Sequence, residues 1–136
     1  MSGPVRVLVD SSVWIDFFSA SPGPAGQLLR QWIADAQPVL IAGVVITEIL
    51  QGLTRDVETI ERFLSQWEML EPQGIATYIR AANLFRLGRS RGLPLTTVDV
   101  LIAGIALDHK VELFTLDRDF ARLARFVPLS IHRLNS

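Results

Sequence analysis

Acidic residues occupy several places in this sequence where an apolar, strand-like segment ends or a helical segment begins. The residues in these places are Asp10, Glu48, Asp99, Asp117 and Asp119. Carboxylate oxygens are hard ligands, which suit Mg²⁺ or Mn²⁺ better than Zn²⁺. If these side chains lie together, their mutual repulsion must be relieved by protonation or by such a cation. The residue types therefore favour a divalent-cation site, provided that the fold brings them together.

A helix cap is the structural alternative for Asp10. Ser11 or Ser12 could cap the same helix, which would leave the carboxylate of Asp10 available for another role. Glu48 is harder to explain structurally, because its neighbours are apolar and Glu is rarely buried without a partner.

The other acids fit capping patterns. Asp99 stands three residues after Thr96 in a capping-box arrangement, where an acid also interacts favourably with the helix dipole. One of Asp117 and Asp119 is expected to cap the last helix. For these residues the sequence leaves a structural role and a metal-binding role open.

Short apolar segments alternate with helical patterns along the chain. The segments predicted as strands are Val5–Val9, Val39–Ala42, Val111–Thr115 and Leu129–His132. Helical patterns cover residues 13–18, 28–36, 44–53, 57–67, 75–92, 98–107 and 118–126. This alternation is typical of a parallel sheet, because parallel neighbours need crossover connections. We predict a single α/β domain over residues 1–136.

This fold class determines where the acids meet. Ligands of open parallel sheets bind beyond the carboxyl ends of the strands. Asp10 ends the first predicted strand, Asp117 ends the third, and Glu48 lies in the helical turns after the second. We therefore expect the carboxylates to share one edge of the sheet.

Composition narrows the class of protein. The chain has 136 residues, 49% of them hydrophobic, a formal net charge of −1 and no cysteine. Disulfides and thiolate metal sites are excluded, and the net charge does not by itself indicate nucleic-acid binding. No apolar run reaches the ~18 residues of a membrane span, and no secretory signal is recognisable. We expect a cytoplasmic protein that does not enter a membrane.

Four stretches carry a resemblance to a known family. They are LVDSSVWIDFF, ITEILQG, TTVDVLIAGIAL and LFTLDRDFARL. In these stretches and in this order, the chain resembles the PIN-domain ribonucleases, most closely the VapC-type toxins of bacterial toxin–antitoxin modules. The resemblance extends from Val5 to about Arg133. It implies a three-layer α/β/α fold with a central, mostly parallel sheet.

The resemblance also implies a site and a reaction. The catalytic acids would be Asp10, Glu48, Asp99 and Asp117. One or two Mg²⁺ or Mn²⁺ ions would be held by Asp10, Asp99 and Asp117, with Glu48 and Asp119 as further candidate ligands. Ser12 and Thr115 would support these groups by hydrogen bonding. The reaction would be attack of an activated water on an RNA phosphodiester, leaving a 5′-phosphate and a 3′-hydroxyl.

The implied partners are an RNA substrate, a small cognate antitoxin and a second copy in a homodimer. RNA binding needs phosphate neutralisation. The candidate residues are Arg80, Arg86, Arg89, Arg91 and Arg118. A solvated helix face is the structural alternative for each of them.

Two other functions compete with this one. A catalytically inactive PIN-fold module could act through protein binding alone, using apolar residues such as Trp14, Phe17 and Phe18. A phosphoryl-transfer protein with Asp10 as its nucleophile fits poorly. Haloacid-dehalogenase-like phosphatases need Asp-x-Asp-x-Thr after the first strand, and receiver domains need a lysine after a late strand, whereas Lys110 precedes one.

Overall fold

A four-stranded parallel sheet forms the centre of the computed structural model, which describes residues 6–134. Its strands are β1 (Val7–Val9), β2 (Val39–Ala42), β3 (Glu68–Leu70) and β4 (Glu112–Phe114), in the order β3-β2-β1-β4. Val7 of β1 is in register with Val39 of β2 and with Glu112 of β4. The predicted α/β class with a parallel sheet is confirmed.

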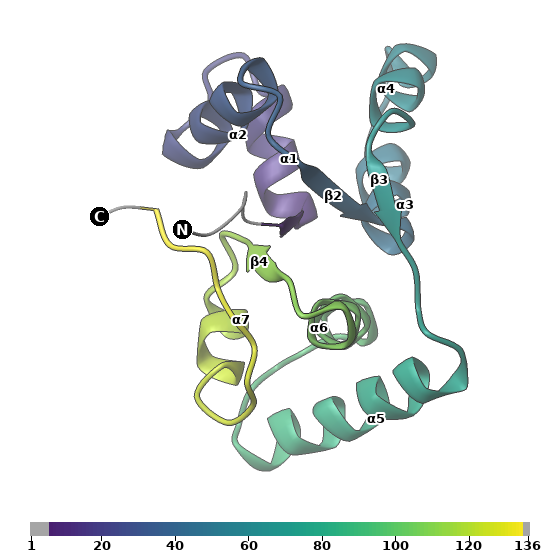
Figure 1. Cartoon of the computed structure of the whole chain (residues 1–136), viewed down its shortest axis with the longest axis vertical. Coiled ribbons are helices and arrows are strands. Elements are labelled where there is room, and N and C mark those ends of the chain that lie inside the picture. The colour runs from purple at the N-terminus through teal and green to yellow at the C-terminus, as the bar shows by residue number, and fades with distance from the viewer. Residues whose placement is uncertain (1–5, 135–136) are drawn as a thin grey trace.

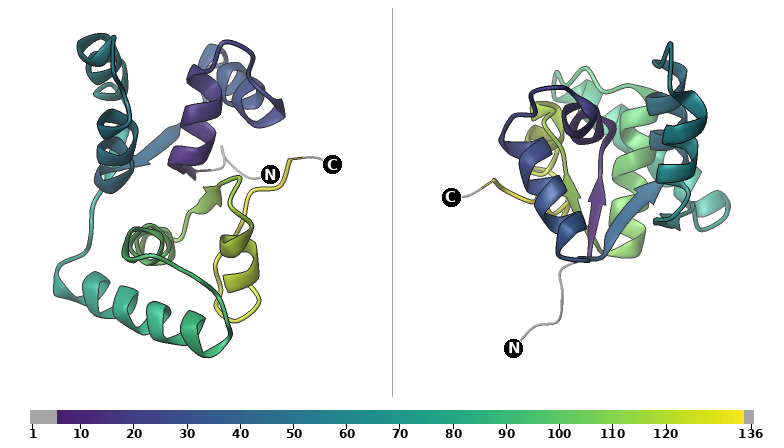
Figure 2. Two further views of the ribbon diagram at one scale, coloured as in Figure 1. Left: turned by 180° about the vertical axis from the view of Figure 1, so that it is seen from behind. Right: turned by 90° about the horizontal axis from the view of Figure 1, so that it is seen from above.

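Helices cover both sides of this sheet. They are α1 (Ser11–Phe18), α2 (Pro24–Ala34), α3 (Gly43–Gln51), α4 (Val57–Leu64), α5 (Ile75–Ser90), α6 (Thr97–His109) and α7 (Arg118–Leu123). In Figure 1, α1 and α2 lie above the sheet, α5, α6 and α7 lie below it, and α3 and α4 stand beside β3. Figure 2 shows the same arrangement from behind and from above. No helix within residues 6–134 is long and apolar enough to cross a membrane.

The core forms because both faces of the sheet are apolar. Every residue of β1 and β2 is buried, as expected for parallel strands covered on both sides. Helix α6 supplies a nearly continuous buried surface that includes Ile102 and Ile105. Each such side chain contributes about 1.5–3 kcal/mol when it leaves water. The strands that carry the acids are thus fixed from both sides.

The predicted strands agree with the structure in three places and fail in one. Val39–Ala42 has the predicted bounds, and the first and third strands are shorter than predicted. Val5 lies outside the described residues. The predicted strand Leu129–His132 is wrong, because only Ile131 forms a bridge, with Leu113. The structure also contains β3, which the sequence did not predict.

Asp16 and Gly26 fix the first helix against the second. The carboxylate of Asp16 accepts the backbone N–H groups of Gly23 at 2.9 Å and Gly26 at 2.8 Å. A Cβ at Gly26 would come within 2.8 Å of the backbone of Asp16 and Phe17, so only glycine allows this approach. This packing joins the second half of α1 to the start of α2.

Candidate active site

Asp10 is the most buried acid at the carboxyl edge of the sheet. It follows β1 directly and keeps only 5% of its surface exposed. Its backbone N–H donates to the carbonyl of Phe114 at 2.9 Å, which continues the β1–β4 pairing up to this residue. The end of β1 therefore holds a carboxylate inside the protein, where its negative charge must be stabilised by hydrogen bonds or by a positive charge.

Two hydroxyl groups supply part of that compensation. Ser12 donates to Oδ2 of Asp10 at 2.9 Å, and Thr115 donates to the same oxygen at 2.8 Å. Each hydroxyl also accepts a backbone N–H, Ser12 from Leu116 at 3.0 Å and Thr115 from Asp117 at 3.0 Å. The loop after β4 is thus attached to the first turn of α1, and both supporting residues of the predicted site lie at Asp10.

Ser11 and Ser12 do not cap α1, so that prediction is wrong. Asp10 occupies the N-cap position, and no side chain forms a capping hydrogen bond there. The hydroxyl of Ser11 instead donates to Oε1 of Glu48 at 2.9 Å, which connects α1 to α3. The acids compete successfully for both hydroxyls because a hydrogen bond to a charged group is stronger than a neutral one.

Burial and neighbouring charge act on these two carboxylates. Burial raises the pKa of Asp10, and the hydroxyls of Thr115 and Ser12 partly oppose that increase. Burial also raises the pKa of Glu48, the Ser11 hydroxyl lowers it, and the charges of Asp10 and Asp99 raise it further. Asp10 and Asp99 therefore lie close enough to Glu48 for the charge of each to act on it.

Asp99 takes part in a complete capping box at the start of α6. Its Oδ2 accepts the backbone N–H of Thr96 at 2.8 Å, while its own N–H donates to the Thr96 hydroxyl at 3.1 Å. The capping pattern is confirmed, and the charge of Asp99 still acts on Glu48.

Asp117 and Asp119 both lie at the start of α7. Asp117 is the N-cap, and its Oδ1 accepts the N–H of Asp119 at 2.9 Å. Asp119 forms an ion pair with Arg122 at 2.9 Å. The expectation that one of the two acids caps this helix is confirmed. The backbone N–H of Asp117 donates to the hydroxyl of Thr115, and this hydroxyl donates to the carboxylate of Asp10.

The candidate ligands share one pattern of hydrogen bonding. Within residues 6–134, Glu48, Asp99 and Asp117 each accept hydrogen bonds on one carboxylate oxygen, and Asp10 accepts both of its side-chain hydrogen bonds on Oδ2. Asp16 differs, because each of its oxygens accepts a backbone N–H. A carboxylate with one oxygen in a hydrogen bond can bind a cation through its other oxygen and keep that hydrogen bond.

This donor set fits a hard divalent cation in its chemistry. All the donors are carboxylate oxygens, and three of the acids interact unfavourably without a counter-charge. Within residues 6–134, however, no three Asp, Glu or His side chains are gathered tightly enough to hold an ion as they stand. The charges of Asp10 and Asp99 act on Glu48, and the role of all the candidate acids as metal ligands stays a prediction.

The candidate RNA-binding arginines differ in their contacts. Arg80 forms an ion pair with Asp108 at 2.7 Å, and only 8% of that carboxylate side chain is exposed. Arg86 donates to Asn83, and Arg91 lies over the ring of Phe126 at 4.8 Å. Arg89 and Arg118 are exposed. Of the five, Arg80 has the clearest structural role, because it joins α5 to α6.

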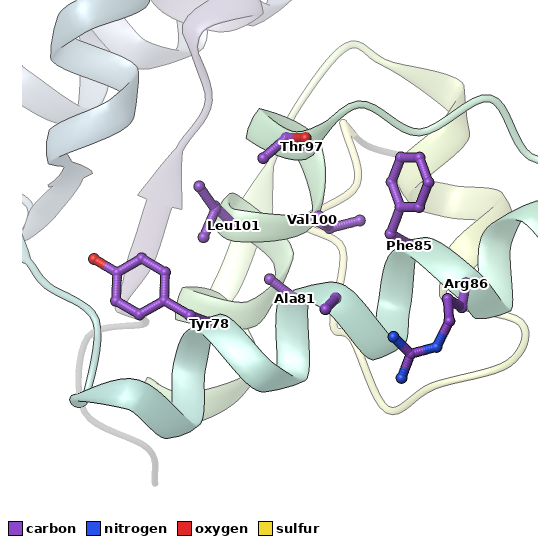
Figure 3. A pocket seen from close by; sticks show the side chains of 8 residues that line it. Tyr78, Ala81, Phe85, Arg86, Thr97, Val100 and Leu101 are labelled. Carbon is purple, nitrogen blue, oxygen red and sulfur yellow. The ribbon is translucent and has the colours of Figure 1, made fainter.

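An apolar cleft lies between α5 and α6, on a different face of α6 from Asp99. It has a volume of 360 Å³, and Figure 3 shows Tyr78 and Phe85 of α5 around it together with Val100 and Leu101 of α6. None of the candidate acids lines this cleft. The cleft is a surface for apolar contact, separate from the acidic edge.

A comparison with known families decides what kind of domain this is. The family model described as "PIN domain" matches residues 7–126. The chain belongs to the PIN domain family. This PIN domain is 28% identical over 127 residues to ribonuclease VapC11 of Mycobacterium tuberculosis, an alignment that covers 90% of the chain and 95% of that relative. A VapC ribonuclease of Mycobacterium bovis aligns with the same identity and coverage.

Solved structures agree with the PIN fold. DNA-bound VapBC of Salmonella typhimurium matches with a TM-score of 0.76 at 17% identity, covering 96% of this chain and 99% of that one. VapC20 of Mycobacterium tuberculosis, a toxin that cleaves the sarcin-ricin loop, matches with a TM-score of 0.67 at 18% identity, covering 91% and 98%. At these identities the likeness establishes the fold.

Sequence reasoning did not find the hydrogen bond between Ser11 and Glu48 in this PIN domain. Its position at a helix start made a cap the simplest interpretation. The available signal was the pair of adjacent serines after Asp10, because one cap needs only one of them. The second hydroxyl was therefore available for a contact outside the helix.

Proposed function

We propose that this chain is a metal-dependent endoribonuclease and the toxin of a type II, VapBC-like toxin–antitoxin module. The observation that carries the proposal is the buried carboxylate of Asp10, whose ionised form is disfavoured by burial and whose charge acts on Glu48. A cation relieves both effects. The 28% identity to VapC ribonucleases supports RNA as the substrate class.

Mg²⁺ or Mn²⁺ would be held by Asp10, Asp99 and Asp117, with Glu48 and Asp119 as further candidates. When bound, such a cation supplies positive charge to phosphate oxygens and makes water more acidic near neutral pH.

The remaining steps belong to the chain's own residues. Ser12 and Thr115 hold one oxygen of Asp10 and so orient its other oxygen. Glu48 is the proposed proton acceptor for the attacking water, since a carboxylate whose pKa is raised by burial is a stronger base. The products would be a 5′-phosphate and a 3′-hydroxyl.

The proposed partners are a small antitoxin and a second copy of the chain, acting in the cytoplasm. A toxin–antitoxin complex from Klebsiella pneumoniae and VapBC from Salmonella typhimurium share the fold, which supports an antitoxin. Apolar side chains on α5 are available for such contacts, since Ile75 is 76% exposed and Tyr78 and Ile79 are each 54% exposed.

Expression of wild type and Asp10→Asn in bacteria, with all RNA 5′ ends mapped, tests the proposal. Wild type is expected to arrest growth and create new 5′-phosphate ends, and Asp10→Asn is expected to do neither. Equal toxicity of the two proteins would refute the role of Asp10. Growth arrest without new RNA ends in either strain would favour a PIN-fold module that acts by protein binding alone.

A further inference from the structure

We propose that Ser11 is a positioning residue, which holds the carboxylate of Glu48 at the acidic edge of the sheet. This inference rests on the proposed function. It extends that function because Ser11 was not among the candidate site residues. The observation behind it is the hydrogen bond from the Ser11 hydroxyl to Oε1 of Glu48 at 2.9 Å.

This hydrogen bond joins two elements that approach the site from different strands. Ser11 is the first residue of α1, directly after β1, and Glu48 lies in α3, directly after β2. The two residues are 37 positions apart in the chain. The hydroxyl is not needed for a helix cap, since α1 forms without a side-chain capping bond.

The carboxylate of Glu48 depends more than those of the other acids on a hydrogen bond that holds it in position. It is only partly buried, and the charges of Asp10 and Asp99 act against its ionised form. Its side chain also has more rotatable bonds than Asp, so repulsion alone would turn the carboxylate towards solvent. Within the described residues, Ser11 provides the one side-chain hydrogen bond to this carboxylate.

The neighbouring hydroxyl of Ser12 does the same for Asp10. Ser12 donates to Oδ2 of Asp10, so consecutive residues of one helical turn each orient one acid. Because both hydroxyls belong to the same rigid turn, they fix the two carboxylates relative to each other. Loss of the Ser11 hydroxyl would release Glu48 and leave Asp10 in place.

The test measures Mn²⁺ affinity of the full chain by calorimetry and initial rates of Mn²⁺-dependent cleavage of total bacterial RNA. Ser11→Ala is expected to weaken Mn²⁺ binding by about tenfold, which is typical when a group orienting a metal ligand is lost. Ser11→Thr retains a hydroxyl and should restore affinity. Ser90→Ala is the matched control, because the Ser90 hydroxyl donates only to the carbonyl of Leu87 on α5.

A double-mutant cycle separates positioning from a general effect on folding. If Ser11 acts through Glu48, Ser11→Ala should change neither Mn²⁺ affinity nor cleavage in a Glu48→Ala background. An equal, additive loss in both backgrounds would overturn the inference, and so would wild-type Mn²⁺ affinity in Ser11→Ala.

The proposed function has its own outcome in the same experiment. If wild type neither binds Mn²⁺ nor cleaves RNA, the proposed function fails and this inference fails with it. If wild type does both and Ser11→Ala matches it, only the inference fails. Urea unfolding of every variant without metal shows whether each protein is folded during the measurement.

Discussion

The hydroxyl of Thr115 lies 2.8 Å from Oδ2 of Asp10, and this contact joins residues 105 positions apart in the chain. The same hydroxyl accepts the backbone N–H of Asp117 at 3.0 Å. One small side chain therefore supports a buried carboxylate and sets the start of the loop that leads to α7. The acidic edge is held by neutral hydroxyl groups as well as by the strands.

Replacing Thr115 by Val should cost stability and activity together. The substitution keeps the shape but removes one donor and one acceptor, leaving Asp10 and the Asp117 N–H without these partners. We expect a loss of about 1–3 kcal/mol in the free energy of unfolding, measured in urea. Thr115→Ser retains the hydroxyl and should recover most of it; a Val variant as stable as wild type would contradict this.

Replacing Asp16 should reduce stability without reducing RNA cleavage, whereas replacing Asp10 should abolish cleavage. Asp10 directly precedes α1, and Asp16 lies within it. Asp16→Ala removes two hydrogen bonds to the start of α2, so we expect a loss of about 1–2 kcal/mol in unfolding free energy. RNA cleavage per folded molecule should stay at the wild-type level. A folded Asp16→Ala protein that fails to cleave RNA would place Asp16 in the site instead.

Without divalent cations, the stability of wild type relative to Asp10→Asn should fall as pH rises. Burial raises the pKa of Asp10 in the folded protein above that in the unfolded chain. Its contribution is therefore fully present below the ordinary pKa of Asp and is lost as pH rises through the raised value. Urea unfolding of both proteins from pH 4 to pH 8 checks this, and parallel curves would contradict it.

Mg²⁺ should stabilise wild type at pH 8 and should stabilise Asp10→Asn much less. A ligand at about one hundred times its Kd adds about 2.7 kcal/mol to the folded state when it binds only that state. Thermal unfolding over a Mg²⁺ titration measures the increase, with Ca²⁺ for comparison. Equal increases for the two proteins would place the ion away from Asp10.

Two arginines of α5 should differ in what they affect. Arg80→Ala leaves the buried carboxylate of Asp108 without its ion pair, so we expect a loss of about 1–3 kcal/mol in the free energy of unfolding. Arg89→Ala should keep stability and weaken binding of the Asp10→Asn protein to bulk tRNA. The plot of log binding constant against log salt concentration should become shallower by about 0.7–0.9, which is the contribution of one phosphate contact. An unchanged slope would remove Arg89 from the RNA surface.

Much of the fold followed from the sequence because buried parallel strands are continuously apolar. Val39–Ala42 has this pattern, and the structure gives it the predicted bounds. β3 lacks it, since Glu68 and Met69 are exposed and only Leu70 is buried. This strand exists because β2 offers it a partner, which local sequence does not encode.

At Leu129–His132, by contrast, the sequence predicted a strand that the structure does not contain. The segment is apolar enough for a strand, but the N–H of Leu129 bonds to the carbonyl of Val127 in a tight turn just before it. After this turn, Ile131 forms a single isolated bridge, with Leu113. A turn defined by backbone geometry overrode the side-chain pattern.

The sequence named candidate site residues, but it did not predict their hydrogen bonds and ion pairs. Asp10, Glu48 and Asp99 were expected at one edge of the sheet, and the charges of Asp10 and Asp99 do act on Glu48. The hydrogen bond between Ser11 and Glu48 depends on how α1 and α3 pack, and this packing has no local signature. The ion pair of Arg80 with Asp108 was hidden for the same reason.

The order of the chain has a consequence for a protein that would attack RNA. β1 is made first, yet it needs β4 and Thr115 as neighbours, and these are more than one hundred residues away. A ribosome releases the N-terminal part of a chain long before the rest. Until β4 and Thr115 have been synthesised, Asp10 therefore lacks its hydrogen-bond partners, and the site cannot be assembled.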